Sequence, residues 1–141
     1  MRKLCLALAL VASPALAQDA TVYTFDGSFD DATFGVESAI VGRGLVVDWV
    51  SHVGQMLART GQDVGSDVTL FENADVFMFC SATLSRKVME ADPANVAFCP
   101  YAVYVAEREG VVTVGYRNLP EGPMQEVQAL LDSIALEAVG K

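Results

Sequence analysis

The strongest constraint on the fold is a pair of β-rich segments, residues 101–106 and 111–116, separated by a short polar turn. Both segments are rich in valine and tyrosine, residue types that pack well on a pleated sheet. Arg108-Glu109-Gly110 lies between them and has the composition of a tight chain reversal. We therefore expect a β-hairpin, which makes these two strands antiparallel neighbours.

Other strand-like and helix-like segments are mixed along the chain without a regular βαβ repeat. Ser28 precedes Asp30 and Asp31 as a helix N-cap precedes an acidic first turn, and Pro123 suits a first helical position. We expect further strands at residues 20–25, 45–50 and 76–79, and helices over residues 28–42, 53–60, 81–91 and from 123 onward. The pattern predicts one α+β domain, with a mainly antiparallel sheet and helices packed on one face.

The first residues have the pattern of a cleavable secretory signal. Arg2-Lys3 is a positive start, residues 4–12 are apolar, and Pro14-Ala15-Leu16-Ala17 ends in the small-x-small pattern of a cleavage site. This apolar run is too short for an uncleaved anchor, because a helix needs about 20 residues to cross a bilayer. We expect residues 1–17 to be removed, residues 18–141 to form the domain, and the protein to be periplasmic with no membrane span.

The charge balance argues against nucleic acid as a partner. The chain has 9 Lys+Arg against 18 Asp+Glu, a net charge of −9. Removal of residues 1–17 from the 141 leaves 124 residues with a net charge of −11, because Arg2 and Lys3 are lost. A domain this acidic repels phosphate backbones.

Two cysteines, Cys80 and Cys99, remain once Cys5 is lost with the signal. A single pair in an oxidising compartment is typical of one disulfide, which would stabilise the fold by about 3 kcal/mol. The spacing is not Cys-x-x-Cys, and no basic residue is adjacent to lower a thiol pKa. Two alternatives stay open, a redox-active or metal-binding pair and two buried free thiols.

His52 is the chain's single histidine, so any acid–base or metal hypothesis depends on it. Met56 lies four residues later, on the same face of a helix that includes both residues, and Met89 is a further soft ligand. No motif requires a cofactor, so we expect none, with His52 solvated or hydrogen-bonded at a strand end and the methionines in the core. The alternative is that copper or non-covalent haem binds these residues.

The hairpin carries three tyrosines, Tyr101, Tyr104 and Tyr116, and the neighbouring Arg117. If they line one exposed face of the hairpin, they mark a surface for a partner or ligand. In the alternative, the tyrosines pack under the terminal helix.

Several segments resemble the bacterial and archaeal family called domain of unknown function 302. The resemblance rests on Phe79-Cys80-Ser81-Ala82, on Val88-Met89-Glu90-Ala91-Asp92-Pro93, on Phe98-Cys99-Pro100 and on the strand at residues 103–107. Gly44-Leu45-Val46-Val47 is similar to the family's second strand. The resemblance covers nearly all of residues 18–141 and implies a compact α+β fold that is often a homodimer. The family's name specifies no activity.

Catalytic motifs are missing from the sequence. It has no Gly-x-Ser-x-Gly and no phosphate-binding glycine loop. We therefore expect a non-enzymatic periplasmic binding or accessory module, stabilised by one disulfide, with an unknown protein partner or small ligand. The alternative is a periplasmic redox or metal/haem-binding protein that uses Cys80, Cys99 and His52.

Overall fold

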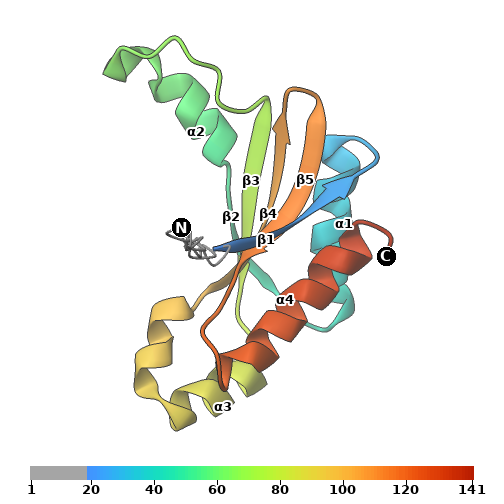
Figure 1. Cartoon of the computed structure of the whole chain (residues 1–141), viewed down its shortest axis with the longest axis vertical. Helices are drawn as coiled ribbons and strands as arrows, with labels where there is room; N and C mark the ends of the chain where they lie inside the picture. The colour runs from blue at the N-terminus through green and yellow to red at the C-terminus, as the bar shows by residue number, and fades with distance from the viewer. Residues whose placement is uncertain (1–18) are drawn as a thin grey trace, which may run out of the picture.

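The computed structural model describes residues 19–141, so the expected signal peptide lies outside the described residues. Within that range the chain alternates between strands and helices (Figure 1). The strands are β1 (Ala20–Phe25), β2 (Val47–Ser51), β3 (Asn73–Phe79), β4 (Tyr101–Arg108) and β5 (Val111–Arg117). The α-helices are α1 (Phe29–Gly42), α2 (Val53–Thr60), α3 (Ala82–Ala91) and α4 (Met124–Ala138), and the 3-10 helices are η1 (Gln62–Val64) and η2 (Pro93–Phe98).

The strands form one five-stranded sheet in the order β1-β5-β4-β3-β2, and each neighbouring pair is antiparallel. β4 and β5 form the expected hairpin, closed by the pair Arg108 and Val111. Glu109 and Gly110 between them have φ of 53° and 73°, the positive values that a two-residue type I′ turn requires. The predicted α+β fold with an antiparallel sheet is confirmed.

Helices α1 and α4 pack against each other and cover one face of the sheet (Figure 1). Side chains alternate along each strand, so Tyr101, Val103 and Val105 of β4 point to these helices and are buried. Val36 and Ile134, from α1 and α4, are fully buried in the same core. Full burial of side chains of this size contributes about 1.5–3 kcal/mol each.

The helix starts follow the signals in the sequence. The Ser28 hydroxyl accepts a hydrogen bond from the Asp31 amide at 3.1 Å, so the predicted N-cap of α1 is confirmed. Ser81 caps α3 in the same way through the Leu84 amide at 3.4 Å. α1 ends at Gly42, and Gly44 follows with φ of 72°, a left-handed conformation that glycine adopts freely.

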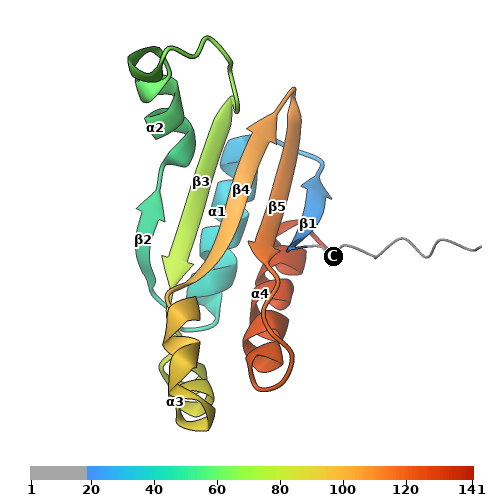
Figure 2. The same ribbon diagram turned by 60° about the vertical axis from the view of Figure 1, so that its left-hand side comes forward.

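The other face of the sheet is left uncovered by α1 and α4, and Figure 2 looks onto it. α2 extends beyond one end of the sheet and contacts β3, whereas α3 and η2 lie together beyond the opposite end. In residues 19–141 we find no helix with the length and hydrophobicity needed to cross a membrane.

Candidate functional site

Cys80 and Cys99 lie side by side at one end of the sheet. Cys80 follows directly after β3, and Cys99 lies two residues before β4 begins at Tyr101. The last residue of β3, Phe79, pairs with Tyr101, the first residue of β4. The two Sγ atoms are 3.1 Å apart and both thiols are free, whereas a disulfide has an S–S distance of about 2.05 Å. The antiparallel pairing of β3 and β4 thus places the two cysteines side by side, and the bond itself stays a prediction.

The electrostatic surroundings keep the Cys80 thiol protonated. Desolvation of the sulfur, followed by the hydrogen bond with Cys99 and the nearby Asp48 carboxylate, raises the pKa of Cys80 to about 12. Asp48 lies where the register of β2 against β3 shifts, between Val47 and Trp49. The thiolate is the form that attacks electrophiles and binds metals. The pair therefore suits a structural bond better than a nucleophile.

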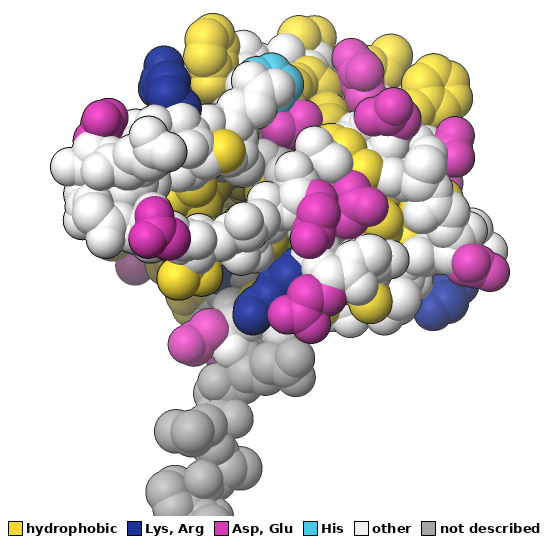
Figure 3. All heavy atoms as spheres, turned by 90° about the horizontal axis from the view of Figure 1, so that it is seen from above, with side chains coloured by type: hydrophobic (Ala, Val, Ile, Leu, Met, Phe, Trp, Pro, Cys, Tyr) yellow, Lys and Arg dark blue, Asp and Glu magenta, His cyan; other side chains and the backbone are white. Residues whose placement is uncertain are grey.

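His52 lies at the other end of β3, at the N-cap position of α2. Its Nδ1 atom is 2.8 Å from Oδ1 of Asp75, and 53% of its side chain is exposed. In Figure 3, which views the molecule from the α2 end, the histidine side chain (cyan) lies at the surface. His52 thus lies at a strand end, hydrogen-bonded to Asp75 and half exposed, in the arrangement expected for a histidine without a metal.

Of the predicted metal ligands, the structure brings His52 and Met56 together. With Gln55 and Arg59 they line a small cavity of about 430 Å³. Met89 belongs to α3, beyond the opposite end of the sheet, and packs against the core. Within residues 19–141, no group of three or more His, Cys, Asp or Glu side chains is arranged to hold a metal.

The expected tyrosine strip is divided between the two faces of the sheet. Tyr101 and Tyr116 are 2% and 3% exposed and lie in the core under the helices. Tyr104 and Arg117 belong to the alternating positions that face the uncovered side. The expectation that these tyrosines and Arg117 share one exposed surface is therefore wrong. Tyr101 and Tyr104 are three residues apart on β4, and an odd spacing along a strand places side chains on opposite faces of the sheet.

Tyr116 instead helps to attach α4 to the sheet. The hydroxyls of Tyr23 and Tyr116 both donate to Oδ1 of Asp132, at 2.5 and 2.7 Å. Burial, and then the hydrogen bond to Asp132, raise the pKa of Tyr116 to about 12. One carboxylate of α4 thus joins β1 and β5.

Two cavities adjoin on the uncovered face. The α2-side cavity has a volume of about 490 Å³ and the η2-side cavity about 550 Å³, and both are bounded by Val76 and Tyr104. Such volumes fall within the range of small-molecule sites, roughly 300–1,000 Å³. The α2-side cavity is also lined by Val53, Phe71, Ala74, Asp75, Val105, Ala106, Arg108, Val111 and Thr113. The η2-side cavity is also lined by Asp19, Ala20, Ala97, Phe98, Pro100, Ala102, Arg117 and Leu119, and at its end it reaches Tyr101 and Leu131 of the core.

Tyr104 lies between the two cavities, and Gly115 makes room for its ring. A Cβ atom at Gly115 would lie 2.6 Å from Cζ and from the hydroxyl of Tyr104, and 2.7 Å from the Thr21 carbonyl oxygen. The ring therefore lies across the neighbouring strand β5. Among the described residues the Tyr104 hydroxyl has no hydrogen-bond partner, so it is free to bind a ligand.

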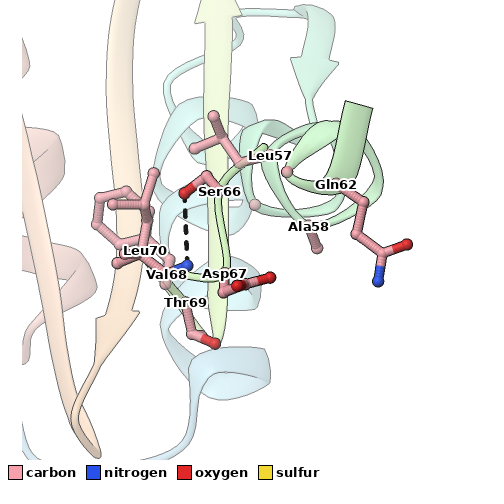
Figure 4. A pocket seen from close by; sticks show the side chains of 11 residues that line it. Leu57, Ala58, Gln62, Ser66, Asp67, Val68, Thr69 and Leu70 are labelled. Atoms are coloured by element: carbon pink, nitrogen blue, oxygen red, sulfur yellow. Dashed lines mark hydrogen bonds between the residues drawn. The ribbon is translucent and has the colours of Figure 1, made fainter. Parts of the chain in front are cut away.

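Another cavity lies between α2 and the segment 66–71 that leads back to β3 (Figure 4). Its volume is about 280 Å³, below the usual range of small-molecule sites. The Ser66 hydroxyl, which accepts from the Val68 amide at 3.4 Å, holds the turn at its edge. We assign no binding role to this cavity.

Comparison of the sequence and the fold with known proteins identifies the family to which the chain belongs. The family model described as "Domain of unknown function DUF302" matches residues 21–138. The chain belongs to the DUF302 family. The crystal structure of an uncharacterized conserved DUF302 protein from Bacillus stearothermophilus is similar to this one, with a TM-score of 0.61 and 18% sequence identity. The match covers 84% of this chain and 89% of that protein.

At 18% identity this likeness shows the fold alone, and the DUF302 resemblance seen in the sequence is confirmed. A search of curated proteins finds no match. The description of the DUF302 family names no activity. The function of this member is therefore argued from its own residues.

The sequence reasoning did not identify the residues of the uncovered face, Val76, Ala102, Ala106 and Gly115. One signal pointed to them. A glycine inside a strand often marks the close approach of another group, and Gly115 interrupts an otherwise β-rich run. Tyr104 is that group.

Proposed function

We propose that this protein is an exported periplasmic binding or accessory module, without enzymatic activity, that holds a small ligand or a partner on the uncovered face of its sheet. The observation that carries the proposal is the pair of adjoining cavities bounded by Val76 and Tyr104. Apolar walls with a few polar groups are typical of ligand sites. The opposite face of the sheet is filled by α1 and α4, and the depression of about 470 Å³ on that side lies on the outer surface of α1, lined by Phe34 and Val41, away from the strands.

The thiol pair supports this role as part of the scaffold. A bond between Cys80 and Cys99 would join the ends of β3 and β4, the two strands that carry Val76 and Tyr104. The segment between the cysteines contains α3 and η2, and η2 contributes Phe98 to the η2-side cavity. A disulfide would thus hold one wall of the proposed site in place.

The alternative of a redox or metal/haem protein using Cys80, Cys99 and His52 receives less support from the geometry. His52 contacts Asp75, and Cys80 lies five residues further along β3, about 16 Å away at the rise of a strand. A single copper or haem site cannot use ligands from both ends. Only the thiol pair itself remains for that alternative.

Binding of a neutral apolar probe, phenylnaphthylamine, to the purified protein tests the proposal. We expect saturable binding with one equivalent per chain. Val76→Glu places a charge between the two cavities and should abolish binding, because burying an unpaired carboxylate there is costly. Val46→Glu is the matched control. Val46 is 70% exposed, lies before β2 and lines neither cavity, so this variant should bind like the wild type.

Two results would overturn the proposal. One is the absence of saturable binding to the folded wild-type protein. The other is an equal loss of binding in Val76→Glu and Val46→Glu. Circular dichroism and the thermal midpoint of each variant establish that it is folded before it is compared.

A further inference from the structure

We propose that the η2-side cavity binds an amphipathic anion, with the apolar body on the cavity floor and the anionic group held by Arg117 and the Tyr104 hydroxyl. This inference rests on the proposed function and specifies its ligand class. The ligand is a carboxylate or sulfonate attached to an apolar group.

Arg117 is the cation that suits this role. It is exposed at the end of β5, lines the η2-side cavity and, within residues 19–141, makes no ion pair. By contrast, three other arginines of the described residues have a carboxylate oxygen within 4 Å. Their partners are Glu137 for Arg43, Glu90 for Arg86 and Glu109 for Arg108. Arg59 and Lys141 also lack such a partner, but neither lines this cavity. A guanidinium binds carboxylates and similar anions through paired hydrogen bonds.

Asp19 is the acidic side chain that also lines the η2-side cavity. Its carboxylate is more than 4 Å from the Arg117 guanidinium, since the two form no ion pair. Its backbone carbonyl accepts a hydrogen bond from the Asn118 amide at 3.0 Å, which fixes the backbone there. The guanidinium is therefore open to an external anion.

The Tyr104 hydroxyl lies near Arg117. The side-chain position of Gly115 is 2.6 Å from that hydroxyl, and Arg117 is two residues further along β5 on the same face, about 7 Å away at the rise of a strand. Burial raises the pKa of Tyr104 above its ordinary value, so the hydroxyl keeps its proton and can donate at neutral pH. One anion can thus receive hydrogen bonds from both side chains.

The rest of the cavity suits an apolar body. Val76 and Ala102 form the floor, and Phe98 and Pro100 form the wall next to η2. The volume of about 550 Å³ accommodates a molecule of two or three rings, because drug-sized ligands occupy sites of roughly 300–1,000 Å³.

The charge pattern favours a small anion over a second copy of the chain on this face. Arg108 and Arg117 lie on the uncovered face at opposite ends of the hairpin. Arg108 pairs with Val111 next to the turn, whereas Arg117 lies two residues beyond Gly115, which pairs with Tyr104 away from the turn. Two copies packed face to face about a two-fold axis would bring arginine next to arginine in either strand orientation. Like charges so placed repel each other.

Two dyes with the same fused-ring body test the inference. Anilinonaphthalene sulfonate carries an anionic group, and phenylnaphthylamine is the same body without it. Arg117→Gln should weaken sulfonate binding about ten- to hundredfold, the effect of losing a charged hydrogen-bond donor, and should change amine binding by less than about twofold. Arg59→Gln, on α2 and outside both cavities, is the matched control and should leave both affinities unchanged. Tyr104→Phe should weaken sulfonate binding about fivefold.

The outcomes separate this inference from the proposed function. If phenylnaphthylamine binds but Arg117→Gln affects neither dye, or affects both equally, the anion site is overturned and the proposed function stands. If neither dye binds the folded wild-type protein, both are overturned. Sedimentation of the wild type and of Val76→Glu measures whether the protein is a monomer or a dimer. A wild-type dimer that dissociates in Val76→Glu would identify a second copy as the occupant and overturn the anion site.

Discussion

The Sγ atoms of Cys80 and Cys99 are 3.1 Å apart at the point where β3 ends and β4 begins. The backbone brings them together through the antiparallel pairing of Phe79 with Tyr101. The Cys80 pKa of about 12 keeps this thiol in its unreactive form at neutral pH. We therefore expect the two cysteines to form a structural disulfide.

Protein purified from an oxidising compartment should contain no free thiols, and reduction should lower its free energy of unfolding by about 3 kcal/mol. The reason is that the bond restricts the unfolded chain between the two cysteines. Thiol titration and urea unfolding with and without reductant measure both effects. The double variant Cys80→Ser/Cys99→Ser is the control, and reductant should not change its stability. Two titratable thiols in the oxidised protein would show that the bond does not form.

Gly115→Ala should destabilise the protein by about 1–3 kcal/mol, the usual cost of overpacking. The new methyl group would meet the Tyr104 ring at 2.6 Å and the Thr21 carbonyl at 2.7 Å. The ring can move, but the backbone of β1 cannot move without breaking its pairing with β5. Gly42→Ala is the matched control, because a Cβ there meets nothing within 4 Å. Equal stability of the two variants in urea would contradict the close packing of Tyr104 on Gly115.

The stability of the fold should decline between about pH 10 and pH 12. Burial raises the pKa of Tyr116 from 10.0 to about 12, so above pH 10 the unfolded chain loses this proton while the folded chain keeps it. The stabilisation is complete below pH 10 and is lost as the pH rises through 12. Tyr116→Phe removes this ionisation and should show a shallower decline in urea unfolding across that window. An unchanged slope would mean that Tyr116 does not ionise with unfolding.

His52→Ala should change the free energy of unfolding by less than about 1 kcal/mol. The His52 side chain is 53% exposed, and exposed ion pairs contribute about 0–1 kcal/mol. Urea unfolding at neutral pH measures the difference. A loss of several kcal/mol, or a copper-induced rise in Tm that this variant abolishes, would favour the metal alternative.

The local structure could largely be predicted from the sequence, because its signals are local. The strand of residues 20–25 and the helix of residues 53–60 were expected with the bounds that β1 and α2 have. Ser28 and Gly44 mark the ends of α1 through interactions with residues close in the chain. β2 was expected two residues early, since Leu45 and Val46 are as apolar as strand residues but lie outside the pairing.

The candidate site could not be predicted in the same way, because it depends on which face the helices cover. Alternation along β4 separates Tyr101 from Tyr104, but it does not say which of them is buried. Which tyrosine is buried depends on the face of the sheet that α1 and α4 cover. It also depends on the pairing of β1 with β5, whose residues are far apart in the sequence. The cavities of the uncovered face arise from these long-range contacts.

Nuclear magnetic resonance mapping of phenylnaphthylamine binding tests the central claim most directly. If the uncovered face is the binding surface, adding the dye should shift the backbone amide resonances of Val76, Ala102, Tyr104 and Thr113. The amides of Val46 and Val64, both exposed and outside the two cavities, should stay unchanged. Shifts confined to α1, or spread evenly over the chain without saturation, would contradict the account.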